Sequence, residues 1–255
     1  MSRTIDLNSD LGEAFGAHQV GYDAELFDLI SSANVACGWH GGDPRVMEQT
    51  VRTCMEKGIA IGAHPGYADL VGFGRREIRM SPDEARTDTL YQTAALDGFC
   101  RAAGVKMHHV KAHGAFYNAA VKDRTLSDAI AAGVKSFDPS LVMLAQPGTH
   151  LFAASVAAGL PTAREGFIDR GYNPDGTLVA RGTPGALITD PSEASERVLR
   201  LMQDGRLRAV DGTDLELEVD SLCIHSDTPG AVAVLTRVRE DLEKAGVRIA
   251  TFAGR

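Results

Sequence analysis

One order of features recurs along this chain: a short apolar strand, a histidine beside glycine or proline at its end, and in most cases the start of a helix. It is found in residues 32–44, 59–67, 105–118 and 222–230. Strands that alternate with helices in this way favour an α/β fold with a parallel sheet. Functional side chains of such folds gather at the carboxyl ends of the strands, and they meet at one mouth if the strands close into a barrel.

The segment of residues 32–44 contains the pattern in its fullest form, because an apolar strand runs into a histidine, two glycines and an Asp-Pro pair. Asp43 is suited to cap a helix, and Pro44 is suited to its first turn, where no backbone N–H is needed. His40 is therefore expected beside a helix N-terminus, where negative charge is favoured. Taken alone, this turn fits a functional histidine and a merely hydrogen-bonded one equally well. The recurrence of the pattern favours function.

Polar residues occupy one face of the predicted first strand. Strict alternation over residues 5–10 places Asp6, Asn8 and Asp10 on the same face, and Glu13 follows in a glycine-bounded turn. A strand with its acids on one side indicates a polar interior.

A second polar face is predicted in residues 105–118. On a strand there, His109, Lys111 and His113 share one face, whereas His108 points the other way. A purely structural strand rarely puts a lysine between two histidines on the same face, so this segment favours function over packing.

Charge, length and cysteine content argue against several classes of protein. The 255 residues carry a formal net charge of −8 with lysines and arginines spread singly, which offers no surface for nucleic acid. The start of the sequence resembles a strand rather than a cleavable signal, and no apolar run is long enough to span a membrane, so we expect a cytoplasmic protein. No linker composition divides the chain, so one domain is expected over residues 1–255. The four cysteines lack paired spacing, and Cys37 is expected to be a buried core residue.

Several common catalytic and nucleotide-binding motifs are absent from the sequence, and acid–base chemistry remains as the most compatible kind of catalysis. The sequence has no G-x-G-x-x-G turn, no G-x-x-x-x-G-K-[ST] phosphate loop and no G-x-S-x-G elbow. A divalent ion could bind carboxylates beside neutral imidazoles, with Asp10, His40 and His64 as the most plausible trio, but no short spacing such as H-x-x-x-H supports it. The metal ligands are therefore left unassigned. The residues at or just after predicted strand ends are Asp10, Glu13, His40, His64, His113, His225 and Asp227.

Two loops add charged residues whose roles the sequence leaves open. Arg75 lies in a glycine-rich loop and could contact an anion or be solvated. The turn-rich residues 165–181 contain Glu165, Asp169, Arg170 and Arg181, which could form ion pairs of the loop or contacts to a ligand.

Several long motifs together resemble the LamB/YcsF family, whose members are the A subunits of 5-oxoprolinases. The likeness runs in order over essentially the whole chain. Ala112 stands where the family usually has proline and Ser226 where it usually has glycine, both beside the polar positions. The motifs that carry the resemblance are residues 6–13, 32–44, 62–67, 72–76, 111–118, 165–181 and 225–230.

The resemblance implies a distorted (β/α) barrel of seven or eight strands, similar to glycoside hydrolases and polysaccharide deacetylases. It also implies ATP-dependent opening of 5-oxo-L-proline to L-glutamate together with 5-oxoprolinase subunits B and C. The absence of a phosphate loop fits binding of ATP with those partner subunits, and a divalent metal such as Mg²⁺ could accompany the nucleotide. Whether copies of the chain assemble into a homo-oligomer is left open.

Roles follow from residue type. Asp10 or Glu13 is predicted to be the general base on water, with His40 or His113 relaying protons. Lys111 is predicted to hold the substrate carboxylate or phosphate, and His225 with Asp227 to form an oriented imidazole pair. The predicted substrate-binding residues are Asn8, Asp43, His64, Arg75, Tyr117, Asn118, Glu165, Asp169, Arg170 and Arg181.

Two other functions are compatible with the sequence. The chain could be a metal-dependent deacetylase or other amide hydrolase that works alone. It could also be a noncatalytic subunit that binds the lactam or its partners.

Overall fold

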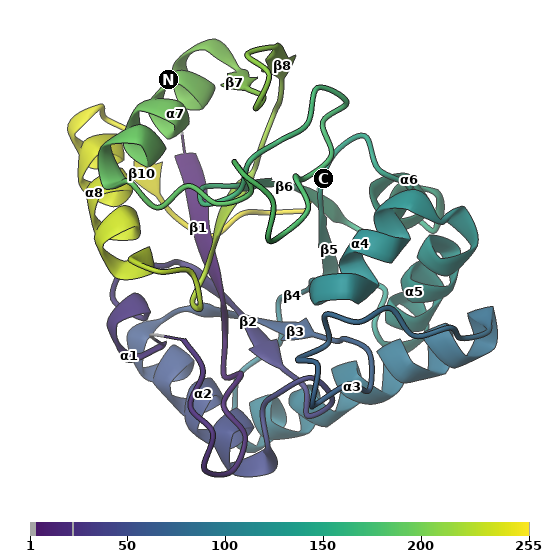
Figure 1. Cartoon of the computed structure of the whole chain (residues 1–255). Helices are drawn as coiled ribbons and strands as arrows, with labels where there is room; N and C mark the ends of the chain where they lie inside the picture. The colour runs from purple at the N-terminus through teal and green to yellow at the C-terminus, as the bar shows by residue number, and fades with distance from the viewer. Residues whose placement is uncertain (1–3, 22, 255) are drawn as a thin grey trace.

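Seven parallel strands pair in a closed ring in the computed structural model, which describes residues 4–21 and 23–254 (Figure 1). Their order is β1-β2-β3-β4-β5-β6-β9, and β9 pairs with β1 to close the barrel. The predicted α/β barrel is therefore confirmed, with seven strands in the ring. A short strand, β10 (Arg248–Ile249), adds beside the start of β1. The barrel strands are β1 (Thr4–Leu11), β2 (Ser32–Ala36), β3 (Ala60–His64), β4 (His109–Val110), β5 (Val142–Ala145), β6 (Thr162–Phe167) and β9 (Ser221–His225).

Helices surround the ring (Figure 1). Their starts follow the expected capping chemistry: Asp43 and Asp190 accept hydrogen bonds from the first backbone N–H groups of their helices, and Ser81 forms a capping box with Glu84. The helices are α1 (Asp23–Leu26), α2 (Pro44–Lys57), α3 (Pro82–Ala102), α4 (Gly114–Lys122), α5 (Arg124–Phe137), α6 (His150–Ala157), α7 (Pro191–Asp204) and α8 (Ala231–Lys244).

Three local features differ from the sequence pattern. The strand expected through residue 113 has only two residues in the sheet, and α4 begins at Gly114 without a side-chain cap. The first helix, expected over residues 22–31, is one turn long, and Tyr22 lies outside the described residues. The acidic connection after residue 211 contains β8 (Asp214–Glu216), which forms an antiparallel pair with β7 (Arg206–Arg208).

Hydrogen-bonded polar side chains fill the barrel interior toward the amino-terminal ends of the strands. Asp6 accepts hydrogen bonds from the hydroxyls of Ser32 and Ser221, and all three side chains are buried. Nearer the carboxyl ends of the strands, the Nε2 atom of His109 lies 2.8 Å from Oδ1 of Asn34. Most barrels of this class fill this space with branched apolar residues. Here the apolar core lies mainly between the strands and the helices, and the interior carries polar groups up to the carboxyl ends.

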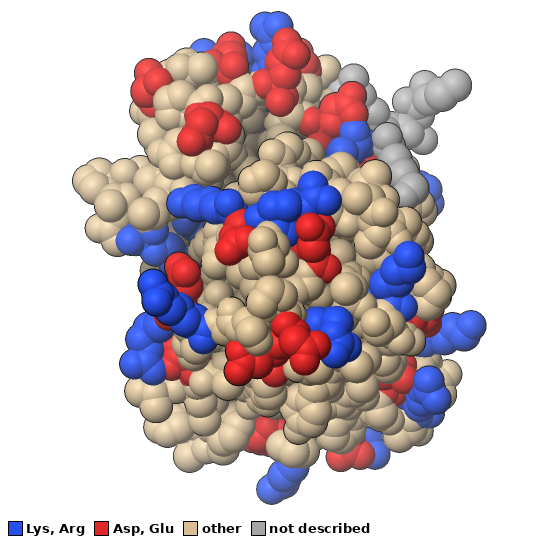
Figure 2. Space-filling model, turned by 90° about the vertical axis from the view of Figure 1, so that its right-hand side faces the viewer, with Lys and Arg blue, Asp and Glu red and all other residues tan. Residues whose placement is uncertain are grey.

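Surface charge and hydropathy complete the description. Lysine and arginine side chains are interspersed with aspartate and glutamate on the face at the right of Figure 1 (Figure 2). Among the described residues, no helix combines the length and apolar character needed to cross a membrane. The expectation of one domain over residues 1–255 stays a prediction.

Candidate active site

A cleft of about 630 Å³ opens at the carboxyl ends of the barrel strands. Strand register explains the convergence: Asp10 on β1 lies level with Asn34 on β2 and with His225 on β9. Residues far apart in the sequence therefore meet at one mouth. The predicted site residues that line the cleft are Asp10, His64, Arg75, Lys111, His113, Tyr117, Asn118, Arg170, Arg181 and His225.

Lys111 is held between two carboxylates at the floor of the cleft. Its Nζ atom lies 2.8 Å from Oδ1 of Asp10 and 2.9 Å from Oε1 of Glu165, and its side chain is 3% exposed. Burial alone would lower the pKa of Lys111, but Asp10 and the other nearby acidic groups outweigh burial and raise it well above its usual range. Burial would raise the pKa of Asp10, but His64 and Lys111 hold it well below its usual range. Asp10 and Lys111 are therefore a fixed ion pair.

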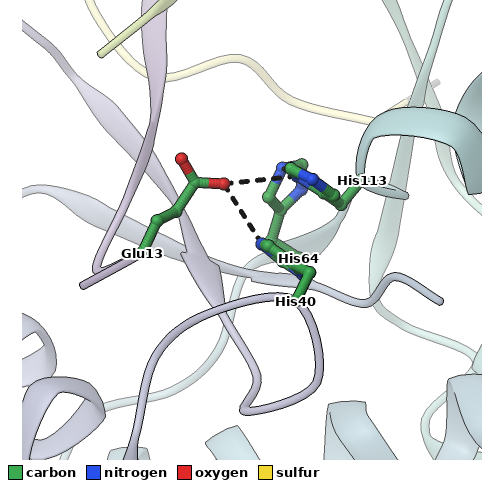
Figure 3. Close-up of side chains that lie close together, drawn as sticks. All are labelled: Glu13, His40, His64 and His113. Atoms are coloured by element: carbon green, nitrogen blue, oxygen red, sulfur yellow. Dashed lines mark hydrogen bonds and ion pairs between the residues drawn. The ribbon is translucent and has the colours of Figure 1, made fainter. Parts of the chain in front are cut away.

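Glu13 and three histidines form a second cluster beside this ion pair (Figure 3). Oε1 of Glu13 lies 3.1 Å from Nε2 of His40 and 3.2 Å from Nδ1 of His113. Nε2 of His64 lies 3.1 Å from Nδ1 of His113 and 3.3 Å from Oδ2 of Asp10. Burial lowers the pKa of His64. Burial and the neighbouring His113 together lower the pKa of His40 to about 3. Glu13 keeps its charge because the two histidines that it contacts outweigh its burial and lower its pKa.

A strained turn covers this histidine cluster. Phe73 adopts a φ of 55°, which is uncommon for a residue with a side chain, and its carbonyl oxygen lies 2.8 Å from Nε2 of His113. Gly74 follows with a φ of 62°, and a Cβ atom there would lie 2.7 Å from Cδ2 of His113 and 2.8 Å from Cβ of His40. Glycine is therefore required where the backbone passes over the rings.

His225 is oriented by Asp169, not by the predicted Asp227. Nδ1 of His225 lies 3.0 Å from Oδ2 of Asp169, which also accepts a 2.6 Å hydrogen bond from Oγ1 of Thr228. Asp169 is buried, yet His225 holds its pKa down to about 2. Asp227 instead forms a 2.6 Å ion pair with Arg75, so the predicted His225–Asp227 pair is wrong. The other ring nitrogen of His225, Nε2, lies 3.9 Å from Oδ2 of Asp10, and both residues line the cleft.

Two predicted substrate-binding residues lie away from the cleft. Asn8 is buried in the barrel interior, where its amide donates a 2.7 Å hydrogen bond to Oγ of Ser221. Asp43 caps α2 and accepts a hydrogen bond from the backbone N–H of Gly16. Both positions are structural, because their polar atoms are used within the protein.

Four other predicted residues are buried directly behind the cleft wall. Each contacts a residue that lines the cleft and fixes its orientation. Tyr117 shows the same kind of arrangement at the wall itself, since its hydroxyl accepts a 2.7 Å hydrogen bond from the Gln146 backbone. The four residues buried behind the cleft wall are Glu13, His40, Glu165 and Asp169.

Three arginines approach one another at the cleft. Arg75, Arg170 and Arg181 all line it. Burial lowers the pKa of Arg170, and the positive charges of Arg181 and Arg75 lower it further. The Arg170 guanidinium also donates a 2.6 Å hydrogen bond to the Val179 carbonyl, which fixes it under the loop. Like charges gathered in this way favour an anion between them.

Sequence reasoning missed several residues of the site. Asn34 donates 2.8 Å hydrogen bonds to both Asn8 and Asp10, and alternation of Ser32 and Asn34 in an otherwise apolar strand was the available signal. The ring of Phe167 stacks on His225 at 5.8 Å between centroids and lines the cleft. An apolar residue at a strand end gives no such signal.

Comparisons with known proteins agree over the whole length of the chain. The model of the LamB/YcsF family matches residues 5–255. A protein of Symbiobacterium thermophilum, named as the A subunit of 5-oxoprolinase, is 51% identical over 97% of this chain and 95% of its own length. A protein of Pyrococcus furiosus with the same name is 49% identical over 96% of each chain. A solved structure called lactam utilization protein, from Thermus thermophilus, is 48% identical with a TM-score of 0.93 and covers 98% of this chain and 100% of its own.

Proposed function

We propose, since this chain belongs to the LamB/YcsF family, that it is the A subunit of an ATP-dependent 5-oxoprolinase. Acting with subunits B and C, it would open 5-oxo-L-proline to L-glutamate. The names of the relatives support the lactam substrate. The observation that carries the proposal is the Asp169–His225 pair beside Asp10, because it supplies a base at a cleft of suitable size for a small cyclic amide.

His225 is the general base in this proposal. A carboxylate whose pKa is held well below its usual range accepts a proton poorly, and this applies to both Asp10 and Glu13. Nδ1–H of His225 donates to Asp169, which leaves the Nε2 lone pair free to take a proton from water. Asp10 accepts the second hydrogen bond of that water and aims it at the lactam carbonyl.

The arginines bind the anionic part of the substrate in this proposal. A lactam is a poor electrophile, and a phosphoryl group on its carbonyl oxygen would make that oxygen a leaving group. Arg75, Arg170 and Arg181 line the cleft and suit a carboxylate or phosphate. Lys111, already held by Asp10 and Glu165, keeps Asp10 ionised instead of holding the substrate.

The nucleotide is bound by the partner subunits in this proposal. The sequence has no phosphate loop. At the cleft, Arg75 is paired with Asp227 and Lys111 with two carboxylates, which fits a small anion better than a triphosphate. Any Mg²⁺ that accompanies ATP would then be bound with it outside this barrel.

The test is glutamate formation and ATP hydrolysis measured with this chain alone, with subunits B and C alone, and with all three. We expect glutamate only from the complete mixture. Glutamate from B and C alone would contradict the proposal, as would opening of the lactam by this chain alone without a nucleotide. The latter result would indicate an amide hydrolase that needs no partner.

A further inference from the structure

Two histidine ring nitrogens face each other in the cluster of Glu13 and the histidines, and neither carries a proton when both rings are neutral. Nδ1 of His64 lies 2.8 Å from the carbonyl oxygen of Lys111, and Nε2 of His113 lies 2.8 Å from that of Phe73. A carbonyl oxygen only accepts hydrogen bonds, so each of these nitrogens must carry the proton of its neutral ring. Nε2 of His64 and Nδ1 of His113 are therefore lone pairs, and they lie 3.1 Å apart.

Two carboxylate oxygens approach the same lone pairs. Oε1 of Glu13 lies 3.2 Å from Nδ1 of His113, and Oδ2 of Asp10 lies 3.3 Å from Nε2 of His64. Four electron-pair donors thus lie together without a proton between the two rings. Such an arrangement is repulsive unless a proton on one ring or a metal ion supplies a positive charge among the four atoms.

We propose that Asp10, Glu13, His64 and His113 bind one divalent transition-metal ion. An ion at about 2.1 Å from tetrahedral ligands separates neighbouring ligand atoms by about 3.4 Å, close to the three distances just given. The ligand atoms of Glu13, His64 and His113 all lie within 4.8 Å of one another, and Asp10 joins them through its contact with His64. Two imidazoles with carboxylates suit Zn²⁺, Mn²⁺, Fe²⁺ or Co²⁺. The backbone carbonyls that hold the far nitrogens of both rings are the partners that metal-binding histidines commonly have.

His40 is excluded from the ligand set by its ring geometry. Its ring stacks on that of His113 with 3.5 Å between centroids and 5° between planes. Nitrogen lone pairs lie in the ring plane, so one ion cannot lie in both planes. His40 instead contacts Glu13 at 3.1 Å and holds that carboxylate toward the ion. The rings of His64 and His113 are nearly perpendicular, at 89°, and can share an ion.

The neighbouring group of Asp10, Cys223 and His225 is a weaker candidate. Nζ of Lys111 lies 3.0 Å from Sγ of Cys223 and 2.8 Å from Asp10, so a positive charge is already bound there. The proposed ion instead lies beside three residues that line the cleft, namely Asp10, His64 and His113, where it can reach a ligand.

Binding of Co²⁺ to the full-length protein tests the proposal without any assay of activity. After removal of metal with a chelator, Co²⁺ is titrated while visible absorption and bound metal per chain are measured. We expect one ion per chain, an absorption spectrum of low-symmetry coordination, and a rise in Tm. His64→Asn and His113→Asn should lose the spectrum, whereas His150→Asn, which changes an exposed histidine of α6, should keep it.

Three results would overturn the proposal. They are no binding of Co²⁺, Zn²⁺ or Mn²⁺ by the wild-type protein, binding that both ligand variants retain, and binding that His150→Asn also loses. If the ligand variants do not fold, anomalous diffraction from wild-type crystals soaked with Zn²⁺ decides. A peak among the four ligand atoms supports the site, and its absence there contradicts it.

Discussion

At the scale of one residue, Asp6 shows how a polar group buried in the barrel makes the stability of the protein depend on pH. It is fully buried, and burial raises its pKa to about 6 against its hydrogen bonds from Ser31, Ser32 and Ser221. A carboxyl group with a raised native pKa binds its proton more tightly in the folded state. Its contribution to stability is therefore complete below about pH 4 and is lost as the pH rises through about 6.

Asp6→Asn should remove this pH dependence. The difference between about 6 and the ordinary 3.8 corresponds to roughly 3 kcal/mol. The free energy of unfolding in urea is measured at about pH 4.5 and about pH 7.5. Between these two pH values it should fall for the wild type by roughly 2 kcal/mol more than for Asp6→Asn. Parallel pH profiles of the two proteins would show that Asp6 titrates normally.

The partner of His225 marks the limit of prediction at this scale. Residue type and position placed His225 at the end of a strand, and the structure puts it at the cleft. The sequence also offered Asp227, two residues away, as its partner. The true partner, Asp169, is 56 residues away in the chain, and only the packing of the loop after β6 against β9 brings the two together. Local spacing carries no information about such a contact.

At the scale of secondary-structure elements, neighbouring strands β3 and β4 are in close contact. Gly62 on β3 pairs in register with His109 on β4, and a Cβ atom at Gly62 would lie 2.2 Å from Nε2 of His109. The imidazole passes over the glycine to reach Asn34. The space that a side chain at position 62 would need is therefore taken by a side chain of the adjacent strand.

Gly62→Ala should destabilise the barrel by about 3 kcal/mol, because the methyl group displaces His109 and breaks its hydrogen bond to Asn34. Gly98→Ala is the matched control, since Gly98 lies in α3 and a Cβ atom there meets nothing within 4 Å. That substitution should stabilise the protein by about 0.5–1 kcal/mol. Urea denaturation of both variants measures the two effects. Equal free energies of unfolding would contradict the packing described here.

Helix starts were predictable at this scale because capping is local. Asp43, Ser81 and Asp190 each cap the helix expected of them. The start of α4 was missed because its N-cap, His113, makes no capping hydrogen bond with its side chain. That side chain is directed to Glu13 and His64 instead. A residue of the candidate site thus occupies the N-cap position, where a capping side chain would have indicated the helix.

At the scale of the whole molecule, the barrel was predictable and the division of roles within it was not. Recurrent strand ends with histidines indicated a common mouth, and seven strands do form one. Whether a side chain lines that mouth or supports it from behind depends on depth in the ring. Asp10 lines the cleft, whereas Asn8, two residues earlier on the same face, is hydrogen-bonded in the interior. Alternation fixes a face but not a depth.

Turnover at saturating 5-oxo-L-proline, with all three subunits present, tests most directly the claim that this cleft performs the chemistry. We predict that His225→Asn lowers kcat by about 100-fold or more, because the general base is lost, while His150→Asn on the outside of α6 does not. Near wild-type kcat for His225→Asn with only a raised KM would contradict the claim and would indicate that this chain binds the lactam without transforming it.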